Sequence, residues 1–227
     1  MKNLEIYIHI PFCVRKCEYC DFLSFPADDD AKLRYVKGLM AEMIFYGPLM
    51  KNYQVSSVYI GGGTPSSIDE QWIAALMEGV FDCFNVLPDA EISIECNPGT
   101  LSREKLLAYR DAGINRLSIG LQSANNDELK LLGRIHTFEQ FVTNYEVARN
   151  VGFKNINVDL MYGLPGQSAS QYMATVNKII RLHPDHISAY SLIVEKGTPF
   201  YEKYKFDMVR QEAGMRTEFL LSLIHIS

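Results

Sequence analysis

The sequence predicts an α/β fold built on one parallel sheet. Six short segments rich in β-branched and aromatic residues alternate with longer segments whose apolar residues have helical spacing. No hairpin turn signal joins the strands, so each helix is expected to return the chain through a right-handed crossover to the next parallel strand. Six such units form either an open doubly wound sheet or a barrel that is not fully closed. Both arrangements place function at the carboxyl ends of the strands.

The elements follow from hydrophobic period and from start and stop signals. Strands are expected at 5–10 (EIYIHI), 57–60 (SVYI), 91–96 (EISIEC), 116–122 (RLSIGLQ), 155–161 (NINVDLM) and 186–193 (HISAYSLI). Helices are expected at about 29–50, 68–85, 101–112, 126–149 with a break at Gly133, and 168–182. Asp69, Ser102, Gly113 and Pro184 flank helices in this pattern, and the acidic run 28–30 is interpreted as a solvated helix start.

Composition limits the class of protein. The chain has 227 residues, of which 48% are hydrophobic and 22% charged, so it is long and apolar enough to form a core. No run approaches about 18 apolar residues and the first residues do not resemble a signal peptide, which predicts a cytoplasmic protein without a transmembrane segment. Lys and Arg total 22 against 27 Asp and Glu, a net charge of -5, which argues against a nucleic-acid partner.

The five cysteines do not form a disulfide framework. Cys13, Cys17 and Cys20 are clustered, whereas Cys83 and Cys96 stand alone and are interpreted as small buried apolar residues. The odd number and the clustering indicate a reducing compartment and a chemical role for the three clustered thiols.

Three thiolates on one loop can close around a soft metal centre. Zinc would require a fourth protein ligand, and the nearest candidate, His9, lies in an alternating strand where a satisfied barrel histidine is the more common case. An iron-sulfur cube held by three cysteines leaves one iron open. The amine and carboxylate of a small molecule could chelate that iron, so the spacing favours a cluster over zinc.

Unusual residues follow five consecutive expected strands. These are Pro11 and the cysteines, the glycine run 61–63 with Thr64 and Pro65, Glu95 with Asn97, Gln122, and Asp159 with Gly163. Glycines let a backbone approach a ligand closely, although a tight turn would also explain them. The carboxylates of Glu95 and Asp159 suggest ligand hydroxyls, an ammonium group or a salt bridge across the mouth, for instance with Arg134.

The run CVRKCEYC resembles the C-x3-C-x-aromatic-C signature of radical S-adenosylmethionine (SAM) proteins, and the GGGTP loop after the second strand agrees with it. The resemblance implies a partial (β/α)6 TIM-like barrel over residues 1–220. It also implies a [4Fe-4S] cluster on Cys13, Cys17 and Cys20, whose fourth iron chelates the methionine part of SAM. One-electron reduction would then cleave SAM to a 5'-deoxyadenosyl radical.

More of the chain resembles the oxygen-independent coproporphyrinogen III oxidases and their HemW-type haem chaperone relatives. The matching segments are IYIHIPFC, YIGGGTPS, ISIECNPG, INRLSIGLQS, LLGRIHT, DLMYGLPGQ and HISAYSLIVEKGTPF. By this resemblance the SAM-contacting residues are Tyr7, Tyr19, Gly62, Gly63, Thr64, Glu95, Gln122, Arg134 and Asp159. Gly61 to Pro65 would hydrogen-bond the methionine amino group through backbone, and Tyr19 would lie against the adenine.

The two relatives differ after the third cysteine. The oxidase pattern has a further cysteine two residues on, whereas this chain has Phe22, which favours the haem-chaperone side unless Phe22 only packs in the core. The resemblance then implies a protein that binds haem and passes it to an acceptor protein. It also implies a second partner that donates electrons to the cluster. The alternative is an enzyme, a coproporphyrinogen dehydrogenase that oxidatively decarboxylates porphyrinogen propionates. A third hypothesis is radical modification of a protein or RNA, which the net negative charge of the chain disfavours.

The chain end carries its own expectation. The haem-binding His-Asn-x-x-Tyr-Trp run of the chaperone group lies beyond the barrel and is absent here, so haem is expected only with the full-length protein. Residues 208–221 have helical spacing, yet the chain ends in LSLIHIS without a stop signal. Those residues coincide with the translation of a transposon mosaic-end adapter. Residues 221–227 are therefore predicted to be non-native, and the downstream domain to be missing.

Overall fold

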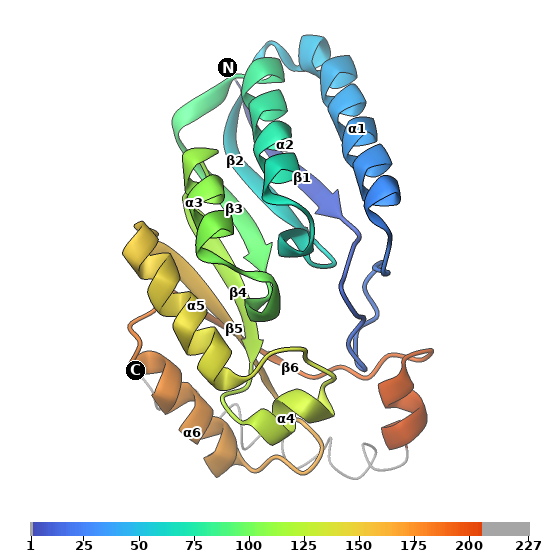
Figure 1. Cartoon of the computed structure of the whole chain (residues 1–227), viewed down its shortest axis with the longest axis vertical. Coiled ribbons are helices and arrows are strands. Elements are labelled where there is room, and N and C mark those ends of the chain that lie inside the picture. The colour runs from blue at the N-terminus through green and yellow to red at the C-terminus, as the bar shows by residue number, and fades with distance from the viewer. Residues whose placement is uncertain (1, 206–227) are drawn as a thin grey trace.

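The computed structural model describes residues 2–205, which form one parallel sheet with helices along it (Figure 1). The strands are β1 (Lys2–Ile10), β2 (Tyr53–Gly62), β3 (Val86–Cys96), β4 (Arg116–Gln122), β5 (Asn155–Tyr162) and β6 (His186–Ser191). The helices are α1 (Asp29–Tyr46), α2 (Glu70–Cys83), α3 (Arg103–Asp111), α4 (Asn126–Leu131), α5 (Phe138–Val151) and α6 (Ala169–Ile180). Short 3-10 turns occupy Gly47–Met50, Pro65–Ser67 and Pro98–Thr100.

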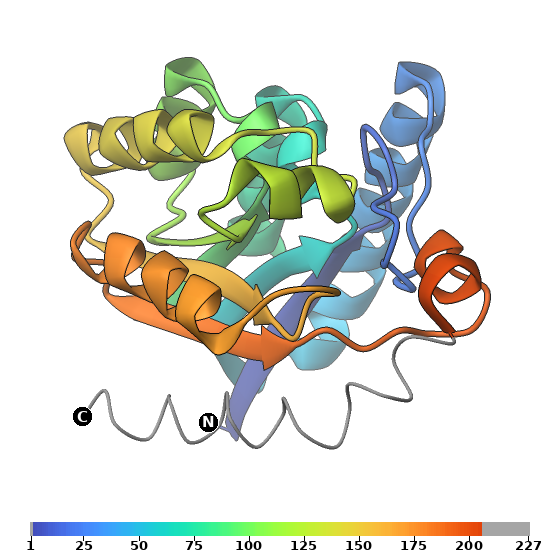
Figure 2. The same ribbon diagram turned by 90° about the horizontal axis from the view of Figure 1, so that it is seen from below.

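The strand order decides between the two expected architectures. Each strand pairs in parallel with its sequence neighbour, in the order β1-β2-β3-β4-β5-β6. A doubly wound sheet reverses its order part-way, and that reversal sends helices to both faces. Without a reversal the helices stay on one side, where α1, α2, α3 and α5 pack in succession, as Figure 2 shows from the end at which the strands finish. The expected partial barrel is confirmed.

Three strands begin earlier in the chain than expected. β1, β2 and β3 begin at Lys2, Tyr53 and Val86, several residues before their apolar patterns. The starts of β1 and β2 are joined by side-chain contacts such as the 3.0 Å hydrogen bond from Gln54 Nε2 to Asn3 Oδ1, whereas β3 begins with Val86 paired with Val55. The register shifts in both strand pairs. Alternating hydrophobicity cannot reveal strand residues whose pairing is polar.

Local capping sets the helix starts. Asp69, Ser102 and Ser168 each accept a hydrogen bond from a backbone N–H in the first turn of α2, α3 and α6, which satisfies a group that the helix itself leaves free. Gly133 has a φ of 73° and separates α4 from α5. The expected helix break is therefore confirmed.

The core lies between the helices and the convex face of the sheet. Fully buried apolar residues alternate along the strands, for example Ile60, Ile94 and Leu117, and meet helix residues such as Leu76 and Phe141. The strand residues between them face the concave side and are mostly polar. The sheet therefore presents apolar groups to the helices and hydrogen-bonding groups to the interior of the partial barrel.

Two predictions concern residues outside the described range. The expected helix at 208–221 and the non-native tail at 221–227 both lie there, so the 1–220 domain limit stays a prediction. Between residues 2 and 205, none of the helices combines the length and the apolar character needed to cross a bilayer.

Candidate cofactor site at the mouth of the barrel

A cavity of about 540 Å³ opens at the carboxyl ends of the strands. Its walls contain eleven of the twelve residues expected at the site: Cys13, Cys17, Cys20, Tyr19, Gly62, Gly63, Thr64, Glu95, Gln122, Arg134 and Asp159. They come from five strand ends and from the segment after α4. The convergence follows from the strand order, since parallel neighbours finish at the same edge of the sheet.

Tyr7 is the expected residue that does not line the cavity. It lies on the edge strand β1 with 58% of its surface exposed, and its ring stacks on that of Tyr59 at 6.2 Å between centroids. Its hydroxyl is 2.9 Å from His9 Nδ1, while His9 Nε2 is 3.3 Å from the carbonyl oxygen of Leu23. Both ring nitrogens of His9 therefore have partners, which confirms its interpretation as a satisfied barrel histidine.

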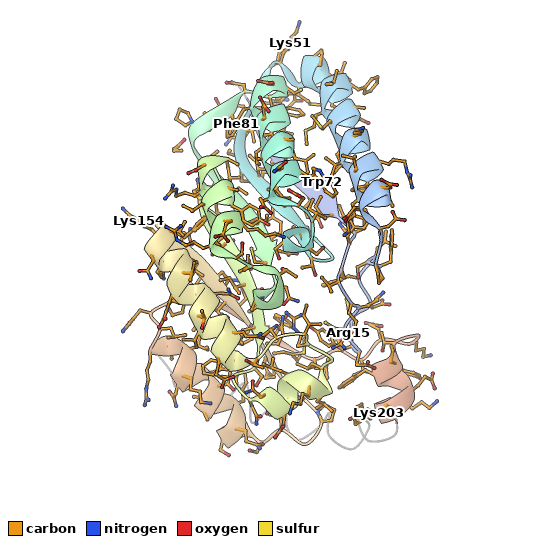
Figure 3. The ribbon with its side chains drawn as sticks, in the orientation of Figure 1. Arg15, Lys51, Trp72, Phe81, Lys154 and Lys203 are labelled. Atoms are coloured by element: carbon orange, nitrogen blue, oxygen red, sulfur yellow. The ribbon has the colours of Figure 1, made fainter. Side chains whose placement is uncertain are left out.

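The cysteine loop is tied to the rest of the barrel by its backbone. Phe25 donates its N–H to the Pro11 carbonyl at 2.9 Å, which closes the base of the loop. The Glu18 N–H donates to the Leu132 carbonyl at 3.2 Å, and Arg15 donates from Nη2 to the Gly133 carbonyl at 2.8 Å. Figure 3 shows Arg15 on this loop. These bonds hold the loop against the segment after α4.

The three clustered cysteines are free thiols at the cavity wall. The Cys13 sulfur is 3.3 Å from Thr64 Oγ1, and burial raises the pKa of Cys20. Within residues 2–205, no three His, Cys, Asp or Glu side chains converge as ligands of a single ion. A cube distributes its cysteine ligands over different iron atoms, so the donor set fits an iron-sulfur cluster better than zinc.

Arg134 is a cation that lacks a carboxylate partner. Its Nη2 donates to the Gly120 carbonyl at 2.5 Å, its Nη1 is 3.5 Å from the sulfur of Cys17, and its buried Nε has no partner. The ion pairs found in residues 2–205 do not include Arg134, so the salt bridge to Glu95 or Asp159 is wrong as an explanation of those carboxylates. A buried donor without a partner is costly. Thiolates or a ligand carboxylate would supply the missing negative charge.

Glu95 fixes the glycine loop. One of its oxygens accepts from the Tyr59 hydroxyl at 2.8 Å and the other from the Gly62 N–H at 3.0 Å, while partial burial raises the pKa of Glu95. Gly62 has a φ of 124°, and a Cβ at Gly63 would lie 2.8 Å from the Phe12 carbonyl oxygen and 3.1 Å from the Cys13 sulfur. The glycines are therefore required where this loop passes the cysteine loop.

Gln122 ends β4 in an unusual conformation. Its φ is 77°, a left-handed value that costs a residue other than glycine about 1–3 kcal/mol. Its Oε1 accepts from the Tyr190 hydroxyl at 2.5 Å, so β6 holds the side chain in the cavity. Tyr19 also lines the cavity. Burial raises the pKa of its hydroxyl to about 12, and the positive charge of Arg134 opposes this shift.

The cavity also contains residues that the sequence analysis did not assign to cofactor or metal binding. They are Arg15, Phe22, Tyr59, Cys96, Asn97, Arg116, Ser118, Gly120, Asn157, Ser188 and Tyr190. Five of them, Asn97, Arg116, Ser118, Gly120 and Asn157, share a strand face with Glu95, Gln122 or Asp159, so period-two alternation from these residues could have identified them. Phe22 is 70% exposed and lines the cavity, so the core-packing explanation of Phe22 is wrong.

His136, in the segment after Arg134, predicts an acid sensitivity of stability. It is buried, and burial together with the nearby Arg134 charge lowers its pKa to about 3. An unfolded histidine titrates at about pH 6.5, so His136 contributes its full stabilisation to the native state above that pH. The free energy of unfolding should fall by about 1.4 kcal/mol per pH unit as the pH falls from about 6.5 toward 3, because the unfolded state then binds a proton that the native state does not. Urea unfolding at about pH 7.5 and pH 5.5 should show this loss. In His136→Asn, the loss of unfolding free energy between these two pH values should be smaller by about 1 kcal/mol. An unchanged pH dependence in this variant would show that His136 is not the group responsible.

A family model described as the radical SAM superfamily matches residues 7–179. Among curated proteins, the haem chaperone HemW of Bacillus subtilis is 40% identical over 196 residues, covering 86% of this chain and 52% of the relative. HemW of Escherichia coli is 39% identical over 203 residues, covering 87% and 52%. The chain thus spans about half the length of the curated relatives it matches.

Solved structures agree on the fold. The coproporphyrinogen III oxidase HemN from Escherichia coli, described as a radical SAM enzyme, superposes with a TM-score of 0.87 at 30% identity, over 99% of this chain and 52% of that one. Methylornithine synthase (PylB) superposes with a TM-score of 0.61 at 15% identity, over 88% and 56%, which shows a shared fold alone.

Proposed function

The chain belongs to the radical SAM superfamily, and on that premise we propose that it is the barrel of a haem-handling protein which binds a [4Fe-4S] cluster and SAM in the cavity. The superfamily implies both groups, and the cavity residues fit them. Cys13, Cys17 and Cys20 would hold the cluster. When bound, the cluster supplies one electron to SAM.

The other residues have separable tasks in this proposal. Backbone groups of the glycine loop, held by Glu95, would receive the amino group of SAM, because glycines leave those groups uncovered. Arg134, which has a buried donor to spare, would take a ligand carboxylate or balance the thiolate of Cys17. Gln122 and Asp159 offer acceptors for hydroxyl or amino groups. Tyr19 would provide an aromatic surface for the adenine.

Phe22 is the observation that favours a haem chaperone over an oxidase. The oxidase pattern has a cysteine at this place, whereas here an exposed phenylalanine lines the cavity beside Cys20. The side chain offers apolar surface and no thiol for redox or radical chemistry. The curated HemW relatives, at 39–40% identity, support the same proposal. As a chaperone the protein would bind haem, and as an oxidase it would bind a porphyrinogen. Its protein partners would be a haem acceptor and an electron donor.

The oxidase remains the competing function because the HemN barrel superposes so closely, with a TM-score of 0.87. The test is an anaerobic incubation of the reconstituted protein, expressed from its complete source gene, with SAM, a reductant and coproporphyrinogen. A haem chaperone should form no protoporphyrinogen and should release bound haem to an apo-haemoprotein. Formation of protoporphyrinogen over several turnovers would overturn the proposal in favour of the enzyme.

A further inference from the structure

The cavity wall holds a hydrogen-bonded cluster of which the proposed function uses only Asp159. The register places Ser118, Asn157 and His186 side by side on β4, β5 and β6, and Asp159 lies one inward-facing position further along β5. Asn157 is only 2% exposed, whereas His186 is exposed at the sheet edge. The cluster therefore links an outer histidine to a candidate ligand-binding carboxylate.

Asn157 uses all the hydrogen-bonding capacity of its amide. Its Nδ2 donates to Asp159 Oδ1 at 2.7 Å and to Ser118 Oγ at 2.8 Å. Its Oδ1 accepts from Ser188 Oγ at 3.0 Å and lies 2.6 Å from His186 Nδ1. A buried amide with four partners is held in one orientation.

The carboxylate determines that orientation. If the amide were rotated by half a turn, its oxygen would face Asp159 Oδ1 at the same short distance with no proton between the two acceptors. With the oxygen on the other side, only a protonated nitrogen can approach it, so His186 must carry its proton on Nδ1. The tautomer of His186 and the orientation of Asn157 are therefore linked.

Asp159 gains a defined rotamer from this arrangement. Asn157 binds one of its oxygens, and Ser118 Oγ donates to the other at 3.2 Å. Ser188 on β6 is a further hydrogen-bonding neighbour of Asp159, so at most three of the four acceptor positions of the carboxylate are taken and at least one stays open to the cavity, whose wall includes Asp159. The neighbours come from β4, β5 and β6, so rotation of the carboxylate would break contacts to more than one strand.

We propose that Asn157 and His186 are positioning residues: His186 holds the Asn157 amide in place through its oxygen, and Asn157 holds Asp159 in the orientation that receives a hydroxyl or amino group of SAM. The proposal rests on SAM binding in the cavity, as proposed above. Neither positioning residue would need to touch the ligand.

A double-mutant cycle tests the link between Asn157 and Asp159. The dissociation constant for SAM is measured on anaerobically reconstituted protein for the unsubstituted chain, Asn157→Ala, Asp159→Ala and the double variant. Asn157→Ala should weaken binding about tenfold when Asp159 is present and less than about twofold when it is absent, since the amide then has nothing to orient. Iron content and the cluster spectrum should stay unchanged. Equal effects in both backgrounds, or none in either, would overturn the proposal.

His186 provides a second test that does not disturb the interior, because its side chain is exposed. In His186→Asn the amide nitrogen takes the approximate place of Nδ1 and can still donate to Asn157, whereas His186→Leu cannot. The leucine variant should weaken SAM binding several-fold, and the asparagine variant should keep affinity within about twofold. Identical affinities for both would contradict the role of His186. Failure of the unsubstituted protein to bind SAM would instead reject the proposed function itself.

Discussion

Replacing Cys13, Cys17 and Cys20 together with alanine should abolish iron and sulfide binding after anaerobic reconstitution. All three thiols lie at one cavity wall, and in the proposed site each thiolate would hold one iron of a cube that has no other protein ligand. The unsubstituted protein should bind about four irons and four sulfides and show the broad visible absorption of a cluster. Iron and sulfide analysis alongside the spectrum checks this.

Cys83→Ala is the matched control, because Cys83 is also a free cysteine but lies on α2 outside the cavity. It should leave iron and sulfide content unchanged. Full iron occupancy in the triple variant would contradict the assignment, as would stoichiometric zinc in the unsubstituted protein.

Removal of the Glu95 carboxylate should separate SAM binding from cluster binding. Glu95 holds the Gly62 N–H and the Tyr59 hydroxyl, and it contacts none of the three cluster cysteines by hydrogen bond. A hydrogen bond to a charged group, such as the one from the Gly62 N–H to Glu95, contributes about 1.5–3 kcal/mol of stabilising free energy. If that energy holds the glycine loop in its SAM-binding conformation, Glu95→Ala should weaken SAM binding by about one to two orders of magnitude. The cluster spectrum should be retained. Equilibrium dialysis with labelled SAM measures the affinity.

Two variants bracket this result. Tyr59→Phe removes one of the two hydrogen bonds that orient Glu95 and should have a smaller effect in the same direction. Asp89→Ala removes an exposed carboxylate on the same strand outside the cavity and should have none. Unchanged SAM affinity in Glu95→Ala would show that the carboxylate serves only the fold of the loop.

Local patterns were sufficient for the element types and for most of the proposed site. Apolar spacing predicted six strands and the break at Gly133, because alternation and helical period reflect the face that each residue must bury. The starts of β1 and β2 were missed because polar side chains make contacts there. Spacing and resemblance selected the three cysteines, Glu95, Gln122, Arg134 and Asp159, and strand order then gathered them at one mouth.

Contacts between distant strands decided the rest. The sequence by itself determined a parallel α/β fold with a cysteine loop and a glycine loop at consecutive strand ends, and the strand order identified it as a partial barrel. Only the tertiary structure placed Tyr7 outside the cavity and Phe22 at its wall, and only it connected Tyr190 to Gln122 and His186 through Asn157 to Asp159. The physical reason is register. Alternation assigns a side chain to a face of its strand, but the partner it meets depends on how β4, β5 and β6 align, which the packing of the whole sheet sets.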